Sequence, residues 1–214
     1  MAKRIFDILL CIWMTIWLII PMIVFAYLIW RRDGAPIFYK AERMKTPTQS
    51  FTLWKFRTMH HSNENNGVSG GNKSNRVTEF GRWLRRTRMD ELPQLWNIFK
   101  GDLSFVGPRP PLREYVEREP EIYAEVLKAK PGVSGLASLI LHGYEERLLK
   151  NCTTPEETDR VYVQRCIPRK ARMDILYRDN QSLCLDVWIV WRTTLLAFFK
   201  IPPRPKTRLA ENAR

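Results

Sequence analysis

The sequence predicts an α+β protein that is predominantly helical, in which an N-terminal membrane segment packs with a small cytoplasmic domain and with interfacial amphipathic helices. Three observations predict this class. Residues 8–30 form an uninterrupted uncharged run, which at about 1.5 Å per helical residue could span the hydrocarbon core of a bilayer. Phe51–Met59 alternates aromatic and polar residues, as an extended segment does. Leu185–Ile201 carries large apolar residues at helical spacing.

Pro21 divides the N-terminal apolar run. Proline removes a backbone donor, so we expect it to kink or break the helix and leave arms at residues 8–20 and 22–30, each too short to cross a bilayer alone. Basic pairs flank the run at positions 3–4 and 31–32, which leaves the positive-inside rule without a preferred direction. A re-entrant arrangement of helix, break and helix keeps both pairs on the cytoplasmic side. A kinked spanning helix is the alternative that these residues leave open.

Composition divides the rest of the chain. We assign residues 1–32 to the membrane segment, 33–201 to a cytoplasmic domain, and the proline-rich residues 202–214 to an extended tail. With 214 residues and 45% hydrophobic content the chain can bury a core, which excludes a disordered protein. The four cysteines form no C-x-x-C motif, which favours reduced thiols in a cytoplasmic domain.

The first half of the domain contains two short elements and a loop. Ile37–Tyr39 and Phe51–Met59 are the predicted extended segments. Ser62–Asn75 is rich in Asn, Ser and Gly, and we expect a mobile loop there. Thr78–Arg86 predicts a short helix with one apolar side. A second helix is predicted at Leu92–Phe99.

The second half is predicted to be helical. Tyr115–Lys128 is expected to form an acidic surface helix broken at Pro120, followed by a turn-rich connection at Lys130–Gly135. Another helix is expected to begin at Pro155. For Leu185–Ile201 an interfacial amphipathic helix and packing in the core fit the pattern equally well.

The chain is strongly basic. It has 35 Lys and Arg against 22 Asp and Glu, so it should bind anions such as nucleic acid, acidic lipid headgroups or phosphorylated substrates. Charge alone does not choose among these classes. Neither a G-x-G-x-x-G nor a G-x-x-x-x-G-K-[ST] motif is present, so any nucleotide must be held in another way.

Asp90 and Glu91 form a carboxylate pair in a basic stretch, Arg82-Trp83-Leu84-Arg85-Arg86-Thr87-Arg88-Met89-Asp90-Glu91-Leu92-Pro93. Guanidinium groups bind phosphate oxygens, and an ionised Asp can attack phosphorus or hold a hard metal ion. The setting therefore indicates phosphoryl transfer. The alternative is that Asp90 only caps the following helix. We expect Asp90 to cap the helix predicted at Leu92–Phe99, where its pKa would be depressed and the carboxylate would stay ionised, as a nucleophile must.

Several ordered motifs carry a family resemblance. They are Lys3-Arg4-Ile5-Phe6-Asp7, Lys55-Phe56-Arg57-Thr58-Met59, Leu84-Arg85-Arg86-Thr87, Asp90-Glu91-Leu92-Pro93-Gln94-Leu95-Trp96-Asn97, Lys100-Gly101-Asp102, Val106-Gly107-Pro108-Arg109-Pro110-Pro111 and Lys130-Pro131-Gly132-Val133-Ser134-Gly135. Together they resemble the bacterial sugar transferases called monotopic phosphoglycosyl transferases. Ala41-Glu42-Arg43 departs from the usual Gln-x-Arg of that family.

The resemblance implies transfer of a phosphosugar from a nucleoside diphosphate sugar, usually a UDP-sugar, to a polyprenyl phosphate such as undecaprenyl phosphate. This reaction would be the first membrane step of bacterial glycan assembly. By family likeness Asp90 is the nucleophile and forms a covalent phosphosugar intermediate. Glu91 would assist it, either through metal binding or by acting on the proton of the acceptor. The implied cofactor is Mg²⁺, for which Asp90 and Glu91 are the expected ligands.

The resemblance also implies a set of substrate-binding residues. Arg109, between Pro108 and Pro110, would hold the nucleotide in a loop that the prolines stiffen. We expect further phosphate contacts from three cations, and Asp186 matches an acidic position near the family's site. The three cations are Lys55, Arg57 and Arg85.

The family pattern implies a re-entrant membrane helix, a location in the bacterial inner membrane and a catalytic domain on the cytoplasmic face. The expected partners are the UDP-sugar, the polyprenyl phosphate and the bilayer, with a homo-oligomer or a complex with downstream glycosyltransferases as further associations. Nucleic acid is not expected, because a nucleic-acid or acidic-lipid binder would leave the setting of Asp90 and Glu91 unexplained. A membrane-tethered basic binding protein, or a scaffold without catalysis, is the alternative function.

Overall fold

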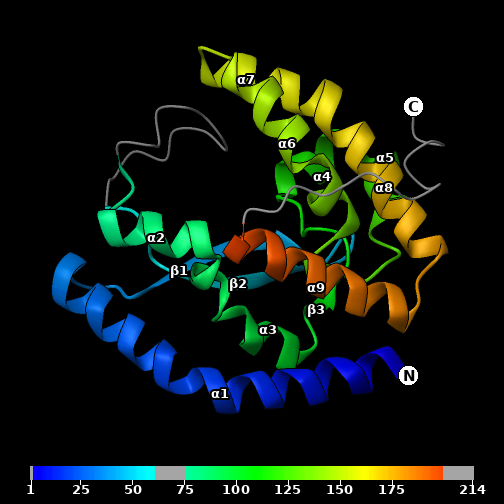
Figure 1. The fold of residues 1–214 in the computed structure, drawn as a ribbon. Helices are drawn as coiled ribbons and strands as arrows, with labels where there is room; N and C mark the ends of the chain where they lie inside the picture. Colours follow the sequence, from blue (N-terminus) through cyan, green and yellow to red (C-terminus); the bar gives the residue numbers. More distant parts are fainter. Residues whose placement is uncertain (1, 61–75, 200–214) are drawn as a thin grey trace.

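A computed structural model of the chain describes residues 2–60 and 76–199, and in the last helix it describes side chains up to residue 196. The predicted loop at Ser62–Asn75 and the predicted tail at 202–214 both lie outside these ranges. The described part is mostly helical with two small sheets, as the sequence predicts. Its elements in chain order (Figure 1) are α1 (Ala2–Asp33), β1 (Phe38–Met44), β2 (Ser50–Phe56), α2 (Glu79–Thr87), η2 (Met89–Glu91), α3 (Gln94–Lys100), β3 (Ser104–Val106), α4 (Arg113–Arg118), α5 (Pro120–Val126), β4 (Gly132–Ser134), α6 (Leu136–Lys150), α7 (Pro155–Val161), η3 (Tyr162–Cys166), α8 (Ile167–Asp179) and α9 (Leu183–Phe199).

Helix α1 is continuous through Pro21. Of the two outcomes expected at Pro21, a break into two arms is absent, and Figure 1 shows one helix that bends along its length. A proline inside a helix removes one hydrogen bond, and the remaining bonds on either side keep the turns together. Within the described residues, α1 is the one helix whose length and apolar content suffice to cross a membrane. Its exposed side chains include Ile5, Leu9, Ile12, Trp13, Ile16, Trp17, Ile20, Ile23, Val24, Tyr27 and Trp30.

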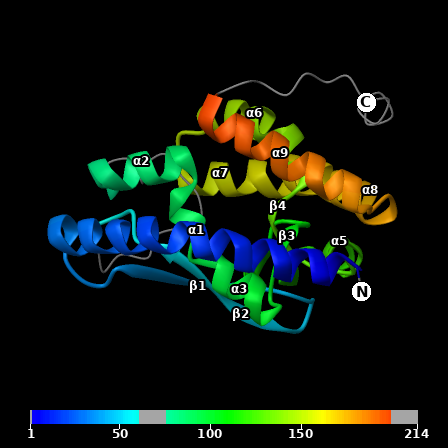
Figure 2. The same ribbon diagram turned by 60° about the horizontal axis from the view of Figure 1, so that its bottom comes forward.

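The first turns of α1 are attached to the domain by polar contacts. Lys3 forms an ion pair with the buried Asp186 of α9, with 2.6 Å between Nζ and Oδ2. Arg4 donates to the carbonyl oxygens of Ile98 and Phe99 at 2.7 and 2.9 Å. These two carbonyls lie in the last turn of α3, where backbone acceptors have no partner within the helix. Figure 2 shows α1 running alongside α3.

The last turn of α1 is attached to the same domain by one arginine. Arg57, which directly follows β2, donates from Nη2 to the carbonyl oxygens of Asp33 and Gly34 at 2.5 and 2.6 Å. The side chain of Arg57 is buried. Both ends of α1 are therefore held by the domain that contains β2, α3 and α9.

The two sheets are small. β1 and β2 confirm the extended segments predicted around Ile37–Tyr39 and Phe51–Met59, and they form an antiparallel hairpin in which Phe38 lies opposite Phe56. β3 and β4 pair in parallel, with Ser104 opposite Gly132. The turn-rich connection predicted at Lys130–Gly135 is thus corrected to a short strand. A Cβ atom on Gly132 would overlap the backbone of Gly107, so only glycine permits these two backbone segments to approach so closely.

The predicted surface helix at Tyr115–Lys128 is divided into α4 and α5 next to Pro120, as expected, but it is not confined to the surface. Tyr115 and Tyr123 are buried in an apolar cluster with residues of η3 and α8. The acidic composition of the segment concealed this, because its charged residues lie on the outer side of each short helix.

Helix α9 combines the two alternatives that its sequence left open. Ile189 is fully buried in the main core cluster, whereas Trp188 and Trp191 are exposed. One side of α9 therefore packs on the domain, and the other presents indole rings to the surroundings, as interfacial helices do.

Replacement of Asp7 by alanine should destabilise the fold. Asp7 is 1% exposed, and its Oδ1 accepts from Ser104 Oγ at 3.1 Å and from the backbone N–H of Phe105 at 3.2 Å. Without the carboxylate that N–H is left unpaired, so Asp7→Ala should lower the free energy of unfolding by about 1–3 kcal/mol. Thermal melts of the detergent-solubilised protein test this. Asp179→Ala, at an exposed carboxylate, should melt like the parent; equal melting of both variants would contradict the role of Asp7.

Candidate active site

Asp90 and Glu91 lie in the single 3₁₀ turn η2, between α2 and α3. Arg88 closes α2 in the left-handed conformation, with φ 59°, and redirects the chain into this turn. The backbone N–H of Glu91 then bonds to the carbonyl of Arg88 at 3.2 Å. Helix α3 begins only at Gln94, with Pro93 before it. The expectation that Asp90 caps the second helix is therefore wrong, because the 3₁₀ turn and Pro93 separate the two.

Glu91 is surrounded by cations. Its Oε1 lies 2.7 Å from Lys55 Nζ and 3.4 Å from Arg109 Nη2, and its Oε2 lies 3.4 Å from Arg88 Nη1. The side chain is 9% exposed. Burial acts to raise the pKa of Glu91, but the charges of Arg109, Lys55 and Arg88 outweigh it and lower the pKa to about 2. The negative charge of Glu91 is therefore buried, and the positive charges of Lys55, Arg88 and Arg109 offset it.

Asp90 is compensated much less. Lys55 Nζ lies 3.9 Å from its Oδ2, and in the described ranges no hydrogen bond reaches the Asp90 carboxylate. Burial raises the pKa of Asp90, and the charge of Glu91 adds to this. The charges of Lys55, Arg85 and Arg109 oppose the rise without cancelling it. The depressed pKa expected for a helix cap is thus corrected to a raised one.

Lys55 joins the two carboxylates, and its position is fixed from α3. Asn97 accepts from the backbone N–H of Trp54 at 3.1 Å and donates to the carbonyl of Thr52 at 2.8 Å, which binds α3 to β2 beside Lys55. Burial and Arg109 lower the pKa of Lys55, while Glu91 and Asp90 raise it, and the net shift is downward. No separate role was predicted for Asn97, which the sequence shows only as the last residue of the motif Asp90-Glu91-Leu92-Pro93-Gln94-Leu95-Trp96-Asn97.

The other predicted site residues divide into two groups. Arg85 belongs to the site: its Nε donates to Thr58 Oγ1 at 2.7 Å, and its charge acts on Asp90. Arg57 is directed instead to the end of α1. Asp186 lies in a separate buried network, in which it pairs with Lys3 and accepts from Tyr177 Oη at 2.5 Å.

The loop with Pro108, Arg109 and Pro110 is held against β4. The carbonyl of Pro108 accepts from the backbone N–H of Gly132 at 2.9 Å, and both prolines are buried. Arg109 leaves this loop as a partly exposed side chain, 43% accessible. The charge of Glu91 raises the pKa of Arg109, with burial acting in the opposite direction.

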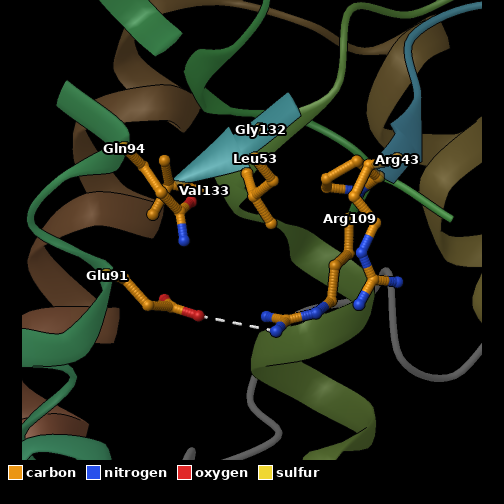
Figure 3. Close-up of a pocket in the computed structure, with 8 residues that line it drawn as sticks. Arg43, Leu53, Glu91, Gln94, Arg109, Gly132 and Val133 are labelled. Carbon is orange, nitrogen blue, oxygen red and sulfur yellow. Dashed lines mark hydrogen bonds and ion pairs between the residues drawn. The ribbon is translucent and has the colours of Figure 1, made fainter. Parts of the chain in front are cut away.

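A pocket opens beside Glu91 (Figure 3). Its lining residues are Arg43, Leu53, Glu91, Gln94, Arg109, Pro110, Gly132 and Val133. Arg43 was not among the predicted site residues. The one signal for it in the sequence was its place in the pattern Ala41-Glu42-Arg43.

The carboxylate pair offers oxygen donors of the kind that Mg²⁺ takes. In residues 2–60 and 76–199 no group of three or more His, Cys, Asp and Glu side chains converges as a metal site. Mg²⁺ commonly takes one or two carboxylates together with water and substrate phosphates. Asp90 and Glu91 provide two such oxygen donors, and the weak compensation of Asp90 leaves that carboxylate able to accept a further cation.

A carboxylate pair framed by cations, beside a helix with an apolar outer face, defines a membrane-associated enzyme that handles phosphate groups. The particular family follows from comparison with known proteins. A family model described as bacterial sugar transferase matches residues 1–200. The chain belongs to the bacterial sugar transferase family.

Relatives of known name agree with this assignment. EpsL, an uncharacterized sugar transferase of Bacillus subtilis, is 33% identical over 191 residues, or 89% of this chain and 84% of that protein. The UDP-N-acetylgalactosamine-undecaprenyl-phosphate N-acetylgalactosaminephosphotransferase of Aeromonas hydrophila is 34% identical over 83% of this chain and 40% of its own length. The UDP-glucose:undecaprenyl-phosphate glucose-1-phosphate transferase of Caulobacter vibrioides is 33% identical over 90% of this chain and 68% of its own length.

The two carboxylates should have opposite effects on stability. The pKa of Glu91 in the folded protein, about 2, lies below its ordinary value of 4.5. Ionisation of Glu91 therefore adds about 3 kcal/mol to the free energy of unfolding above pH 4.5. This contribution is lost as the pH falls toward 2. Glu91→Gln should therefore lower the melting temperature at pH 7 and have little effect near pH 2. The folded pKa of Asp90 is raised, so its ionised form opposes folding at pH 7, and Asp90→Asn should not lower the melting temperature. Fluorimetric melts across this pH range test both, and equal destabilisation by the two variants at pH 7 would contradict the assignment.

Proposed function

We propose that this sugar transferase moves a sugar phosphate from a UDP-sugar to undecaprenyl phosphate, with Asp90 as the nucleophile. The observation that carries the proposal is the asymmetry of the carboxylate pair: Glu91 is neutralised by three cations, whereas the adjacent Asp90 is held nearby with little compensation. The names of the Aeromonas and Caulobacter relatives support the donor and acceptor classes. They name different sugars, so they do not select one for this chain.

In the first step a carboxylate oxygen of Asp90 attacks the sugar-bearing phosphorus of the donor. The bond from this phosphorus to the bridging oxygen breaks, and the electron pair leaves with uridine monophosphate. Two anions must approach each other in this step, so their repulsion has to be offset. Lys55, Arg85 and Arg109 are the cations that act on Asp90. Mg²⁺ bound by the carboxylate pair and the diphosphate would supply further positive charge.

In the second step a phosphate oxygen of undecaprenyl phosphate attacks the same phosphorus. The acyl phosphate bond breaks, and its electron pair returns to Asp90 as a free carboxylate. The weak compensation of Asp90 suits this exchange, because a carboxylate held by several strong ion pairs would be a poor nucleophile. Glu91 keeps Lys55 and Arg109 in place through both steps, since its own ion pairs involve them.

We further propose that α1 is re-entrant and that the domain lies on the cytoplasmic face of the inner membrane. Lys3 and Arg4 at one end of α1 contact the domain, and Asp33 at the other end is held by Arg57 of the same domain. A helix that spanned the bilayer would place its two ends on opposite sides. Contacts of both ends with one domain therefore support a helix that enters and leaves the same leaflet.

Asp90→Asn should abolish the covalent intermediate. Intact-protein mass spectrometry after incubation with a UDP-sugar panel should show a phosphosugar adduct on the parent enzyme, and none on the variant. Turnover, followed as uridine monophosphate release in the presence of undecaprenyl phosphate, should fall by about 10³-fold or more. Asp102→Asn, at a carboxylate that pairs with Lys45, is the matched control and should keep the adduct. An adduct of normal size on Asp90→Asn would overturn the nucleophile assignment.

Cysteine labelling tests the path of α1. Single cysteines at Ala2 and Arg32, in a background without the native cysteines, should both react with a membrane-impermeant maleimide in inside-out vesicles and resist it in intact cells. Ala2→Cys and Arg32→Cys lie at the two ends of the helix. Labelling of one position from outside the cell would establish a spanning helix.

A further inference from the structure

Arg43 occupies a fixed position beside Arg109. It lies on β1, and the next residue, Met44, donates its backbone N–H to the carbonyl of Pro111 at 3.0 Å. This bond joins the end of β1 to the loop that carries Arg109. Both arginines line the pocket, and Figure 3 shows Arg109 between Glu91 and Arg43.

Arg43 has no anion of its own in the described part of the chain. Its Nε is buried without a hydrogen-bond partner, and no carboxylate of those residues lies within ion-pair distance of it. Its neighbour Glu42 is engaged elsewhere, with Oε1 at 2.6 Å from Arg113 Nη2, and successive residues of a strand point to opposite faces. Burial and the charge of Arg109 lower the pKa of Arg43.

Two guanidinium groups thus share one pocket, and only one of them has a carboxylate partner. Such an arrangement is unfavourable in a protein without ligand, because the like charges repel and the buried donor is unpaired. An anion with several acceptor oxygens would offset the repulsion between the two guanidinium groups and pair the buried donor. Guanidinium groups are suited to phosphate in this role.

The geometry points to Arg43 and Arg109 as a clamp for the phosphate of the departing nucleoside monophosphate. This inference rests on the proposed function. If Asp90 attacks the sugar-bearing phosphorus, the leaving oxygen lies on the opposite side of that phosphorus. Both arginines line a pocket together with Glu91, the residue next to Asp90, and their guanidinium groups are suited to the phosphate of the leaving group. Arg43 then stabilises the charge that develops when the bond to the bridging oxygen breaks.

The clamp predicts an effect on the first step alone. Arg43→Met keeps an unbranched apolar side chain about as long as the aliphatic part of arginine and removes the guanidinium group with its charge. In the full-length enzyme it should raise both the KM for the UDP-sugar and the inhibition constant of uridine monophosphate about 10-fold or more, as expected for loss of a charge-assisted contact. Transfer from the preformed phosphosugar enzyme to undecaprenyl phosphate should keep its rate, because the nucleotide has already left. Arg43→Lys should restore part of the affinity.

Arg113→Met is the matched control, since it removes an exposed arginine that pairs with the neighbouring Glu42, and it should leave every constant unchanged. Unchanged nucleotide inhibition in Arg43→Met, or an equal loss in the second step, would overturn the clamp. Calorimetric binding of uridine monophosphate separates this inference from the proposed function. Binding that is weakened by Arg43→Met and retained by Asp90→Asn supports the clamp even if no adduct is found, and binding that Arg43→Met leaves unchanged would refute it even if Asp90 is the nucleophile.

Discussion

The burial of two adjacent carboxylates is the constraint on which the rest of the structure depends. Like charges at neighbouring positions cannot both be ionised in a poorly solvated site unless cations offset them. The chain assigns these cations unequally: Lys55, Arg88 and Arg109 form ion pairs with Glu91, whereas Asp90 has Lys55 at 3.9 Å and weaker effects from the charges of Arg85 and Arg109. The framework elements serve this division, because β2 brings Lys55, the left-handed Arg88 ends α2, and the loop against β4 brings Arg109.

Much of the fold follows from local sequence. The hairpin of β1 and β2 comes from alternating aromatic residues, and α2 and α7 begin where Thr78 and Thr154 accept from backbone N–H groups. The same holds for the carboxylate pair and for Arg109, whose motifs are contiguous in the chain. The elements and site residues that could be predicted are therefore those that short contiguous stretches of sequence specify.

The remaining features depend on residues far apart in the chain. β4 is only three residues long, and it is a strand because β3 lies beside it. The pKa of Asp90 is raised by burial, which a view of the isolated helix start could not include. Arg57 and Asp186 matched family positions, but their partners come from the two ends of α1 and from Tyr177. Arg43 gained significance only when Arg109 was found in the same pocket.

The hydrogen bonds from Arg57 to the end of α1 also link this helix to the candidate site. Arg57 is separated from Lys55 by one residue, and Lys55 is the ammonium group shared by the carboxylates. One short stretch of chain therefore fixes both the end of α1 and the ammonium group beside the two carboxylates, so a substitution that displaces Arg57 is expected to disturb the position of Lys55 as well.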